Sequence, residues 1–388
     1  MTHHHRTRST GALIALAAAA GIATAAGAQT AQLNYSVGFG PASLFAKSAE
    51  AYAEHVGQIS DGAVSIRVFP LGLVSLPEMK QGIRDGLTDI GFMAAPYYPA
   101  EFAHTNFLAD NAILQLLEEP TGREGAAFAG AISEFILTQC PECLEEYRAQ
   151  NHVYMGHIST SPYISLCGPE VVTLADVQGK RFRTGGAGFQ RMAENFGGVA
   201  VQMPSPEAYE ALNQGVLDCV WLAASDLSNL RLIEIVRNIT MRFPGFVFGG
   251  TVAGNINRDS WAGLSLEQRE SLMRGTAFLK AHMTWSYYML EEQDLEAARA
   301  QGVTIHEPDD AMIEGIREFV RADLGRLNEI YTRNFGLARG EEMTEAFYEV
   351  LRRWTDLVGE VETIEDLAAI YWDEIWSQVD PASHGIAN

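Results

Sequence analysis

The sequence predicts an α/β protein of two lobes, each a mostly parallel sheet flanked by helices, with a long helix bridging the lobes and a helical C-terminal extension. Runs rich in β-branched residues alternate with amphipathic helical stretches, which is the pattern of parallel strands joined by helices. The 388 residues suit two domains better than one. From Ser265 to about Gln301 the pattern is helical throughout, and at roughly 1.5 Å per residue such a helix exceeds the width of one small domain.

The N-terminus has the features of a secretory signal peptide. Arg6 and Arg8 precede an apolar stretch, and Ala28 ends an Ala-Gly-Ala triplet that fits the small-x-small cleavage pattern. We therefore expect residues 1–28 to be removed on export to the periplasm. The apolar stretch is short for a membrane span, and no other segment reaches about 18 uncharged apolar residues. No membrane insertion of the mature chain is expected.

Lobe I is predicted to comprise residues 29–156 and 239–264. One of its helices begins after Ser75, where Pro77 occupies the first turn. In the strand that starts at Val64, apolar and polar residues alternate, as in a strand with one buried face. The expected strands of this lobe are Leu33–Val37, Val64–Phe69, Asp89–Met93, His152–Gly156 and the β-rich run Phe246–Ala253.

Lobe II is predicted to comprise residues 157–238 and 302–308. Strands and helices alternate here again, so binding loops are expected at the carboxyl ends of the strands. The expected helices are Phe189–Phe196 and Glu207–Gln214. The expected strands are Tyr163–Leu166, Arg181–Thr184, Ala200–Met203, Leu217–Leu222 and Val303–His306.

The bridging helix is predicted over residues 265–301. Ser265 and Gln268 have the spacing of a capping box, which marks its start. The remainder, residues 309–388, reads as helical and is expected to pack on the lobes. A stripe of apolar residues in this region is expected to face the core, namely Phe347, Val350, Leu351, Trp354 and Val358.

The charge of the chain excludes several classes of partner. Without Arg6 and Arg8 the mature chain has 25 basic and 49 acidic residues, a net charge of −24. Such a polyanion is a poor partner for nucleic acid or for an acidic membrane surface. If the ligand is an anion, its attraction must come from a local site.

The four cysteines lie in a chain bound for an oxidising compartment, where disulfides are plausible. Three pairings are possible, and we expect Cys140–Cys143 and Cys167–Cys219, because each pair falls within one predicted structural unit. The alternative for the first pair is a redox Cys-Pro-Glu-Cys site. Such a site requires the motif to open a helix after a strand, whereas here the motif is expected to close the helix at Ala126–Leu137.

The sequence offers no recognisable catalytic motif. It has no Walker A pattern, no Gly-x-Ser-x-Gly and no His-Glu-x-x-His. The glycine-rich stretch after Thr184 lacks dinucleotide-binding spacing. His152 and His157 lack the spacing of paired helical metal ligands, and we expect them at the surface. No cofactor, no metal and no enzymatic activity are predicted.

The chemically informative segment contains Arg181 and Arg183. On a strand both side chains point to the same face, and glycines follow directly. Both arginines could simply pair with the acidic surface of this protein. Alternatively, one guanidinium faces a cleft, where its planar fork matches a carboxylate in bidentate fashion.

Four segments together resemble the solute-binding proteins of TRAP (tripartite ATP-independent periplasmic) transporters, the DctP family. They are Leu174–Arg183, Gly197-Gly198, Glu207–Asp218 and Ile83–Ile90, and the resemblance extends from about Leu33 to Ile316. It implies a periplasmic binding protein fold whose two lobes close on a small, usually carboxylate-bearing solute. The loaded protein then delivers the solute to a membrane permease driven by an ion gradient.

The resemblance also implies site residues. The arginine that ends the family's Gly-x-x-x-Arg pattern pairs with the ligand carboxylate, and Arg183 occupies that position; Arg181 is expected to be structural. Many relatives carry a second polar or basic contact on the strand Tyr163–Cys167, where this chain offers Ser165. Cys219 and Trp221 also depart from the usual pattern.

These departures favour an apolar or aromatic monocarboxylate over a dicarboxylate or a sialic-acid-like ligand. The loops expected at the cleft carry aromatic residues, of which two or three are expected to touch the ligand. The candidates are Phe39, Tyr97, Tyr98, Trp221 and Phe246.

Alternatives remain open at this stage. The ligand could be a small amine held over aromatic rings by cation–π attraction, in which case Arg183 would pair with an internal carboxylate such as Glu207. The protein could also feed a sensor, or be an exported enzyme whose site has no recognisable motif.

Overall fold

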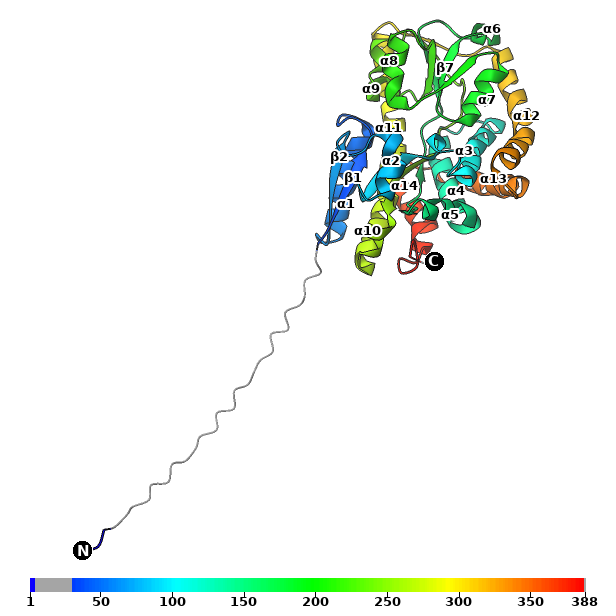
Figure 1. Ribbon diagram of the computed structural model, residues 1–388. Helices are drawn as coiled ribbons and strands as arrows, with labels where there is room; N and C mark the ends of the chain where they lie inside the picture. Colours follow the sequence, from blue (N-terminus) through cyan, green and yellow to red (C-terminus); the bar gives the residue numbers. More distant parts are fainter. Residues whose placement is uncertain (4–29, 387–388) are drawn as a thin grey trace.

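The computed structural model describes residues 1–3 and 30–386, so the apolar stretch and cleavage site of the predicted signal peptide lie outside the described residues. Two six-stranded sheets, each flanked by helices, form two lobes, with lobe II at the top of Figure 1 and lobe I below it. Within the described part of the chain, no helix is long and apolar enough to cross a bilayer.

The sheet of lobe I has the strand order β2-β1-β3-β11-β4, and β5 also pairs with β11. β1 is parallel to β2 and β3, whereas β11 runs antiparallel to β3, β4 and β5. The strands are β1 (Ala31–Val37), β2 (Val64–Pro70), β3 (Ile90–Ala94), β4 (His152–Val153), β5 (His157–Ile158) and β11 (Thr251–Asn257).

Helices cover this sheet and place the loops that face lobe II. The α-helices are α1 (Leu44–Ile59), α2 (Met79–Arg84), α3 (Ala103–Asp110), α4 (Glu124–Gln139), α5 (Pro141–Ala149) and α10 (Arg258–Ala262). Three short 3₁₀ segments join them, η1 (Leu76–Glu78), η2 (Ala95–Tyr97) and η3 (Asn111–Leu117). The segment after β3, where a loop carrying Tyr97 and Tyr98 was expected, contains η2.

The sheet of lobe II has the order β12-β10-β6-β9-β7-β8. Its strands are β6 (Ile164–Cys167), β7 (Arg181–Thr184), β8 (Val199–Gln202), β9 (Cys219–Leu222), β10 (Asn238–Thr240) and β12 (Thr304–His306). Its helical segments are α6 (Leu174–Val177), α7 (Ala187–Asn195), η4 (Ser205–Glu207), α8 (Ala208–Asn213), α9 (Asp226–Asn229) and η5 (Leu232–Glu234).

Both sheets are mixed rather than mostly parallel. In lobe II, β7 is parallel to β8 and β9 and β10 is parallel to β12, whereas β6 runs antiparallel to β9 and β10. A helix that crosses over between two strands returns the chain to the end of the sheet where the first strand began, so the two strands are parallel. β6 and β11 instead adjoin the points where the chain crosses between lobes, so no such helix fixes their direction.

The crossings also lie a few residues from the predicted lobe boundaries. β5 at His157–Ile158 belongs to the sheet of lobe I, and β10 at Asn238–Thr240 belongs to the sheet of lobe II. Single short strands carry little periodicity, and their sheet membership depends on their hydrogen-bond partners.

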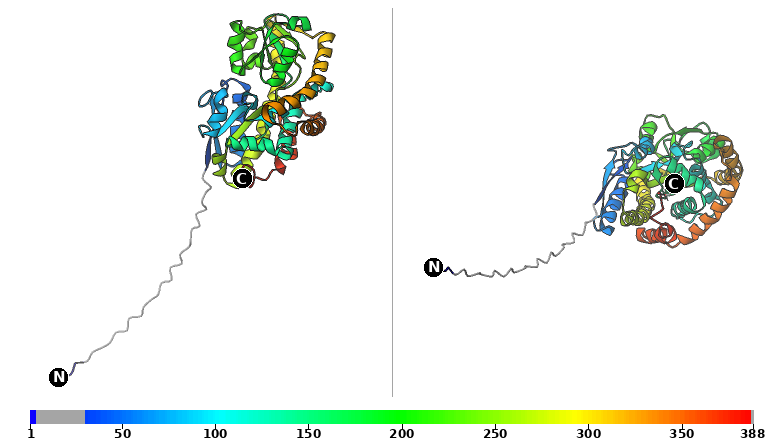
Figure 2. Two further views of the ribbon diagram at one scale, coloured as in Figure 1. Left: turned by 45° about the vertical axis from the view of Figure 1, so that its right-hand side comes forward. Right: turned by 60° about the horizontal axis from the view of Figure 1, so that its bottom comes forward.

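Two long helices connect the lobes. α11 (Leu266–Ala300) starts with the predicted capping box of Ser265 and Gln268, and it packs on α1 of lobe I. α12 (Asp310–Phe335) runs along the outer side of both lobes (Figure 2). Its Phe319 ring contacts Phe196 of lobe II, whereas its Tyr331 ring contacts Phe107 of lobe I.

The C-terminal extension contains α13 (Gly340–Leu357), α14 (Ile364–Glu374) and η6 (Trp376–Gln378), which pack on α4 and α11. Phe347, Leu351, Trp354 and Val358 are buried, as the apolar stripe predicts.

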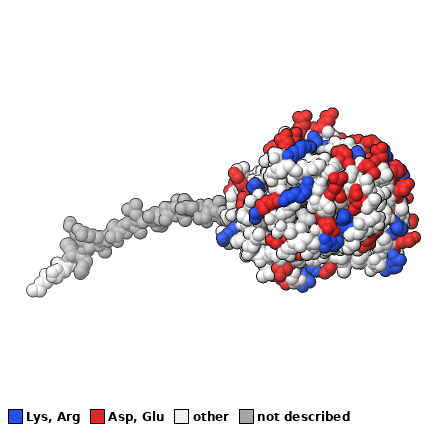
Figure 3. Space-filling model, turned by 90° about the horizontal axis from the view of Figure 1, so that it is seen from above, with Lys and Arg blue, Asp and Glu red and all other residues white. Residues whose placement is uncertain are grey.

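Acidic side chains are spread over the face seen from the lobe II end, with basic side chains between them (Figure 3). The net charge of the whole chain is −22. This face shows no extended basic patch of the kind that nucleic-acid binding uses.

The cysteines form two buried disulfides, Cys140–Cys143 and Cys167–Cys219. The second joins the neighbouring strands β6 and β9. The prediction that the Cys-Pro-Glu-Cys motif closes a helix is incomplete, because Cys140 is also the N-cap of α5. The side chains of Cys140 and Cys143 are both buried, so the position of the motif at the start of α5 does not expose a thiol to solvent, as a redox site requires.

The prediction that His152 and His157 lie at the surface is wrong, because both are buried. His152 Nε2 bonds to the Lys80 carbonyl at 3.0 Å, and burial lowers the His152 pKa to about 4. His157 Nδ1 bonds to the Tyr154 hydroxyl at 2.6 Å. His152 lies on β4, which α5 and α10 cover, and His157 lies on β5, which α4 and α11 cover.

Candidate functional site

Arg183 lies at the boundary between the lobes, near the carboxyl end of β7. Its side chain is buried, and Nε donates to the Met203 carbonyl at 3.0 Å. Nη1 lies 3.3 Å from the Trp221 carbonyl, and Nη2 lies 3.3 Å from the Tyr97 hydroxyl. Met203 and Trp221 belong to lobe II, whereas Tyr97 belongs to lobe I. The guanidinium therefore occupies the place where the lobes meet.

The charge of the Arg183 guanidinium is not neutralised by an ion pair among the described residues. Within residues 30–386, no Asp or Glu forms an ion pair with Arg183. Its neighbours accept with neutral oxygens, and two of the three distances are long for charge-assisted bonds. A buried charge that is not paired is costly, so such a group is suited to an anion from outside the chain.

Arg181, two residues earlier, is paired within the protein. Its Nε and Nη2 bond to the two carboxylate oxygens of Asp218 at 2.9 and 2.8 Å. This bidentate pair fixes the start of β7 against the loop before β9. The same strand thus carries one arginine with a carboxylate partner and one without.

Asp226 is an acidic group on which the charge of Arg183 acts. It is buried at the start of α9, and its Oδ2 accepts from the Ala223 amide at 3.2 Å. Burial raises the Asp226 pKa to about 7, and the charge of Asp294 adds to this effect. The Ala223 amide and the charge of Arg183 oppose it. Near neutral pH, Asp226 can therefore be either a hydrogen-bond donor or an acceptor.

Aromatic rings surround these polar groups. Phe189 stacks on Phe246 with centroids 4.0 Å apart, and Tyr163 stacks on Phe248 at 5.9 Å. Gly185 allows this packing, since a Cβ there would lie 3.1 Å from both the Phe248 ring and Arg183 Nη1. The surroundings of Arg183 are therefore apolar apart from a few oriented polar atoms.

Two phenols add hydrogen-bonding groups to this shell. Burial raises the pKa of Tyr163 and of Tyr287, so both stay protonated. The charge of Arg183 acts on both hydroxyls, which places them in its neighbourhood.

The predicted site residues are distributed unevenly around Arg183. Tyr97 contacts it directly, and Trp221 contacts it through its carbonyl. The Trp221 ring instead lies inside lobe II, where Nε1 donates to Ser165 Oγ at 2.8 Å. Ser165 Oγ in turn donates to the Phe243 carbonyl at 2.9 Å. The indole N–H of Trp221 and the hydroxyl of Ser165 thus form hydrogen bonds inside lobe II rather than facing Arg183.

The remaining candidates lie further away. Phe246 packs on Phe189, and Phe39 packs on Phe45 in lobe I with centroids 4.1 Å apart. The Tyr98 hydroxyl donates to the Pro77 carbonyl at 2.9 Å, within lobe I.

Sequence reasoning missed Asp226, Tyr163, Phe248 and Tyr287. Tyr163 could have been found from its alternation with Ser165, although the alternation does not say which face meets lobe I. Asp226 resembles any acidic residue at the start of a helix, so the sequence carries no signal for it.

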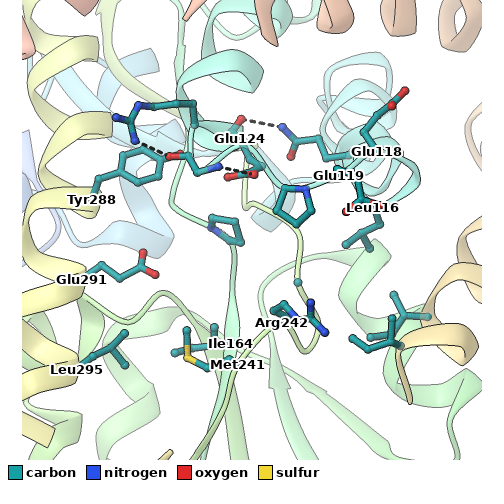
Figure 4. A pocket seen from close by; sticks show the side chains of 18 of the residues that line it. Leu116, Glu118, Glu119, Glu124, Ile164, Met241, Arg242, Tyr288, Glu291 and Leu295 are labelled. Carbon is teal, nitrogen blue, oxygen red and sulfur yellow. Dashed lines mark hydrogen bonds between the residues drawn. The ribbon is translucent and has the colours of Figure 1, made fainter. Parts of the chain in front are cut away.

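A large pocket lies elsewhere, on the other side of the crossing strands. It has a volume of about 660 Å³, and Pro162 and Ile164 line it, whereas Tyr163 between them packs against Phe189. Figure 4 shows it between the lobes, with Glu291 and Tyr288 of α11 on one wall. Arg183 does not line this pocket. Pocket size therefore does not identify the site at Arg183.

Metal chemistry finds no support in the described residues. Within residues 1–3 and 30–386, no group of three or more His, Cys, Asp or Glu side chains could hold a metal ion.

Comparison with known proteins agrees with this architecture. The family model of bacterial extracellular solute-binding proteins, family 7 (DctP), matches residues 138–329. A TRAP periplasmic solute-binding protein from Bordetella bronchiseptica, solved with bound (R)- and (S)-mandelate, is 24% identical. The comparison covers 83% of this chain and 99% of that protein, with a TM-score of 0.70.

Two further structures share the fold. A marine metagenome TRAP solute-binding protein, specific for aromatic acids and co-crystallised with 3-hydroxybenzoate, is 19% identical over 84% of this chain and 99% of its own, with a TM-score of 0.71. A TRAP solute-binding protein from Rhodoferax ferrireducens T118, with copurified benzoate, is 17% identical over 85% of this chain and 100% of its own, with a TM-score of 0.70. The family model thus assigns residues 138–329 to the DctP family of extracellular solute-binding proteins, and the chain as a whole has the two-lobed fold of TRAP solute-binding proteins.

Proposed function

We propose that this protein captures a small organic acid in the periplasm and delivers it to the membrane permease of a TRAP transporter. The observation that carries this proposal is the buried Arg183 guanidinium, which has no carboxylate partner among the described residues. A ligand carboxylate would complete the fork that the Met203 and Trp221 carbonyls and the Tyr97 hydroxyl leave without a counter-charge.

The ligand is a monocarboxylate with an aromatic or apolar body. The rings of Tyr163 and Phe248 supply apolar surface near Arg183, and Phe189 and Phe246 extend this aromatic cluster. Among the described residues, no second arginine or lysine contacts the Arg183 guanidinium, so a dicarboxylate would leave one of its two charges unpaired. The mandelate, benzoate and 3-hydroxybenzoate of the three structural relatives belong to the same chemical class.

The site supports binding without chemical change. Arg183 orients a carboxylate, and the tyrosine and aspartate beside it form hydrogen bonds. No nucleophile paired with a base stands beside the guanidinium among the described residues, which favours a binding protein over an enzyme.

The amine alternative has less support. It requires an internal carboxylate such as Glu207 to neutralise Arg183, but Glu207 is exposed and forms no ion pair with Arg183 among the described residues. Asp226 could attract a cation, although the neighbouring guanidinium would repel it.

Isothermal titration calorimetry on the purified mature protein tests the proposal. Benzoate, mandelate and 3-hydroxybenzoate represent the expected class, succinate the dicarboxylates and benzylamine the amines. We expect at least one aromatic acid to bind and succinate and benzylamine not to bind. Binding of succinate alone, or of benzylamine alone, contradicts the proposed class. Mass spectrometry of any solute released from the purified protein identifies the natural ligand.

A further inference from the structure

Asp110 of lobe I makes its principal contacts with lobe II. It is the last residue of α3, and its Oδ1 accepts from the Gly188 amide in the first turn of α7 at 3.2 Å. Its Oδ2 accepts from Arg191 Nη1, also on α7, at 3.0 Å. The hydroxyl of Tyr331 on α12 donates to the same oxygen at 3.1 Å. One carboxylate thus bonds to an amide and a guanidinium of the opposite lobe.

This carboxylate supplies what α7 lacks. The N-cap of α7 is Gly186, which has no side chain to accept from the first amides of the helix. Asp110 accepts one of these amides from across the lobe boundary. Its negative charge is also favourable at the N-terminus of α7, whereas it is unfavourable at the C-terminus of its own helix α3. The position of Asp110 is therefore favourable only while the lobes are together.

Arg191 has a second partner that does not depend on lobe I alone. Its Nε and Nη2 bond to Asp323 of α12, both at 2.9 Å to the nearer oxygen. Asp323 is buried beside the half of α12 that contacts Phe196 of lobe II. When the lobes separate, Asp323 keeps Arg191 paired, and the bonds of Asp110 to α7 are the ones that break.

The Asp110 contact is coupled to the ligand arginine through a short segment. β7 ends at Thr184, Gly185 and Gly186 follow, and α7 begins at Ala187. The lobe I segment from Tyr97 to Asp110 meets this lobe II segment at both ends, through Tyr97 with Arg183 and Asp110 with Arg191. The ligand arginine and the partner of Asp110 therefore lie on one short segment of lobe II, residues 183–191.

We propose that Asp110 is a positioning residue that latches the closed state, by capping α7 of the opposite lobe and pairing with Arg191 without touching the ligand. This proposal rests on the proposed function, because it assumes that closure accompanies ligand binding. Loss of the latch shifts the lobes towards the open state and speeds ligand release, while the open protein still captures ligand at its normal rate.

The two substitutions at Asp110 separate the two parts of the latch. Asp110→Asn keeps an oxygen for the Gly188 amide but loses the charge, whereas Asp110→Ala loses both. Dissociation rates from stopped-flow experiments with benzoate and mandelate should increase in the order wild type, Asp110→Asn, Asp110→Ala. An increase on the order of 10- to 100-fold is expected for Asp110→Ala, with a nearly unchanged association rate. Asp85→Asn is the matched control, because Asp85 bonds to Gln81 and Arg84 of its own lobe.

Distances between spin labels at Glu50→Cys in α1 and Asn213→Cys in α8 report lobe separation directly. We expect wild type to populate a short distance in part without acid and more fully with acid, and Asp110→Ala to lose part of this population in both conditions. Identical distance distributions in wild type and Asp110→Ala overturn the proposal. A lowered melting temperature with unchanged distances and dissociation rates also overturns it, because Asp110 is then merely structural. If none of the acids binds wild type, the proposed function fails, and the ligand-free distance distributions still decide the latch.

Discussion

The Tyr97 hydroxyl of lobe I lies 3.3 Å from Nη2 of Arg183 in lobe II. The same hydroxyl accepts from the Ser205 amide of lobe II at 3.2 Å. Tyr97 therefore joins the lobes at the guanidinium that we propose to bind the ligand. This arrangement makes the orientation of Arg183 depend on both lobes.

Tyr97→Phe should weaken acid binding while leaving the fold intact. The substitution removes one hydrogen bond to Arg183 and one to Ser205 but keeps the ring. We expect a loss of about 0.5–1.5 kcal/mol, roughly 2- to 12-fold in affinity, by calorimetry. The control is Tyr98→Phe, because the Tyr98 hydroxyl bonds within lobe I. Equal effects of the two substitutions on affinity would show that Tyr97 has no special position.

Arg183→Ala should abolish most of the affinity for aromatic acids. Removing one partner of a buried charge pair costs about 2–5 kcal/mol, or roughly 30-fold to several thousand-fold. Arg183→Lys should also be harmful, because the bidentate fork is lost. Arg181→Ala on the same strand is the control, since Arg181 pairs with Asp218. Near-wild-type affinity of Arg183→Ala in calorimetry would contradict the assignment of Arg183 as the residue that binds the ligand carboxylate.

Affinity for an acid should decrease as the pH rises through about 7. Burial raises the Asp226 pKa to about 7, so Asp226 is largely protonated below that value and charged above it. A ligand carboxylate at Arg183 brings a second negative charge near Asp226, which favours the protonated form. Above pH 7 binding must therefore take up a proton, and affinity falls by up to about tenfold per pH unit.

Asp226→Asn should remove this pH dependence, as calorimetry at pH 6 and pH 8 can measure. The same shift affects stability. Between about pH 4 and pH 7 the folded protein holds a proton on Asp226 that the unfolded chain has released. The free energy of unfolding of the wild type, relative to that of Asp226→Asn, should therefore decrease as the pH rises from about 4 to about 7. A pH profile shared by wild type and Asp226→Asn would contradict both expectations.

Lys280→Met should stabilise the protein at neutral pH. Lys280 is buried on α11, its Nζ bonds to Ser133 Oγ at 2.6 Å, and burial lowers its pKa well below the usual value. The unfolded chain then binds a proton that the folded protein does not, so wild type loses stability as the pH falls below about 10. The difference in the free energy of unfolding between Lys280→Met and the wild type should decrease by up to about 1.4 kcal/mol per pH unit as the pH rises towards 10. Urea unfolding at pH 7 and pH 9 measures this difference in the free energy of unfolding. In the variant, Ser133 keeps its bonds to the His157 amide and the Ala129 carbonyl. A less stable variant at pH 7 would mean that packing of the lysine outweighs its desolvation.

Some elements could be predicted because short stretches of sequence decide them. β7 at Arg181–Thr184 has the predicted bounds, and α11 starts after the predicted capping box at Ser265. Strand alternation and helix capping involve residues within about four positions, so the local sequence contains the information.

The candidate site could be predicted only in part. Arg183 and Tyr97 lie together, because Arg183 is near the end of β7, Tyr97 follows β3, and both strand ends meet at the lobe boundary. Trp221 and Ser165 do not offer their side chains there, because the indole and hydroxyl bond to each other inside lobe II. Which face of β6 and β9 is internal depends on packing across the sheet.

The sequence by itself determined the alternation of strands and helices, the bridging helix and the arginine at the end of β7, since each depends on residues close together in the chain. Only the tertiary structure decided the mixed strand directions, the burial of His157, the raised pKa of Asp226 and the contact of Asp110 with α7. The physical reason is that desolvation and electrostatic pairing depend on groups far apart in the sequence, which no local pattern records. Gly188 and Asp110, for example, are 78 positions apart along the chain.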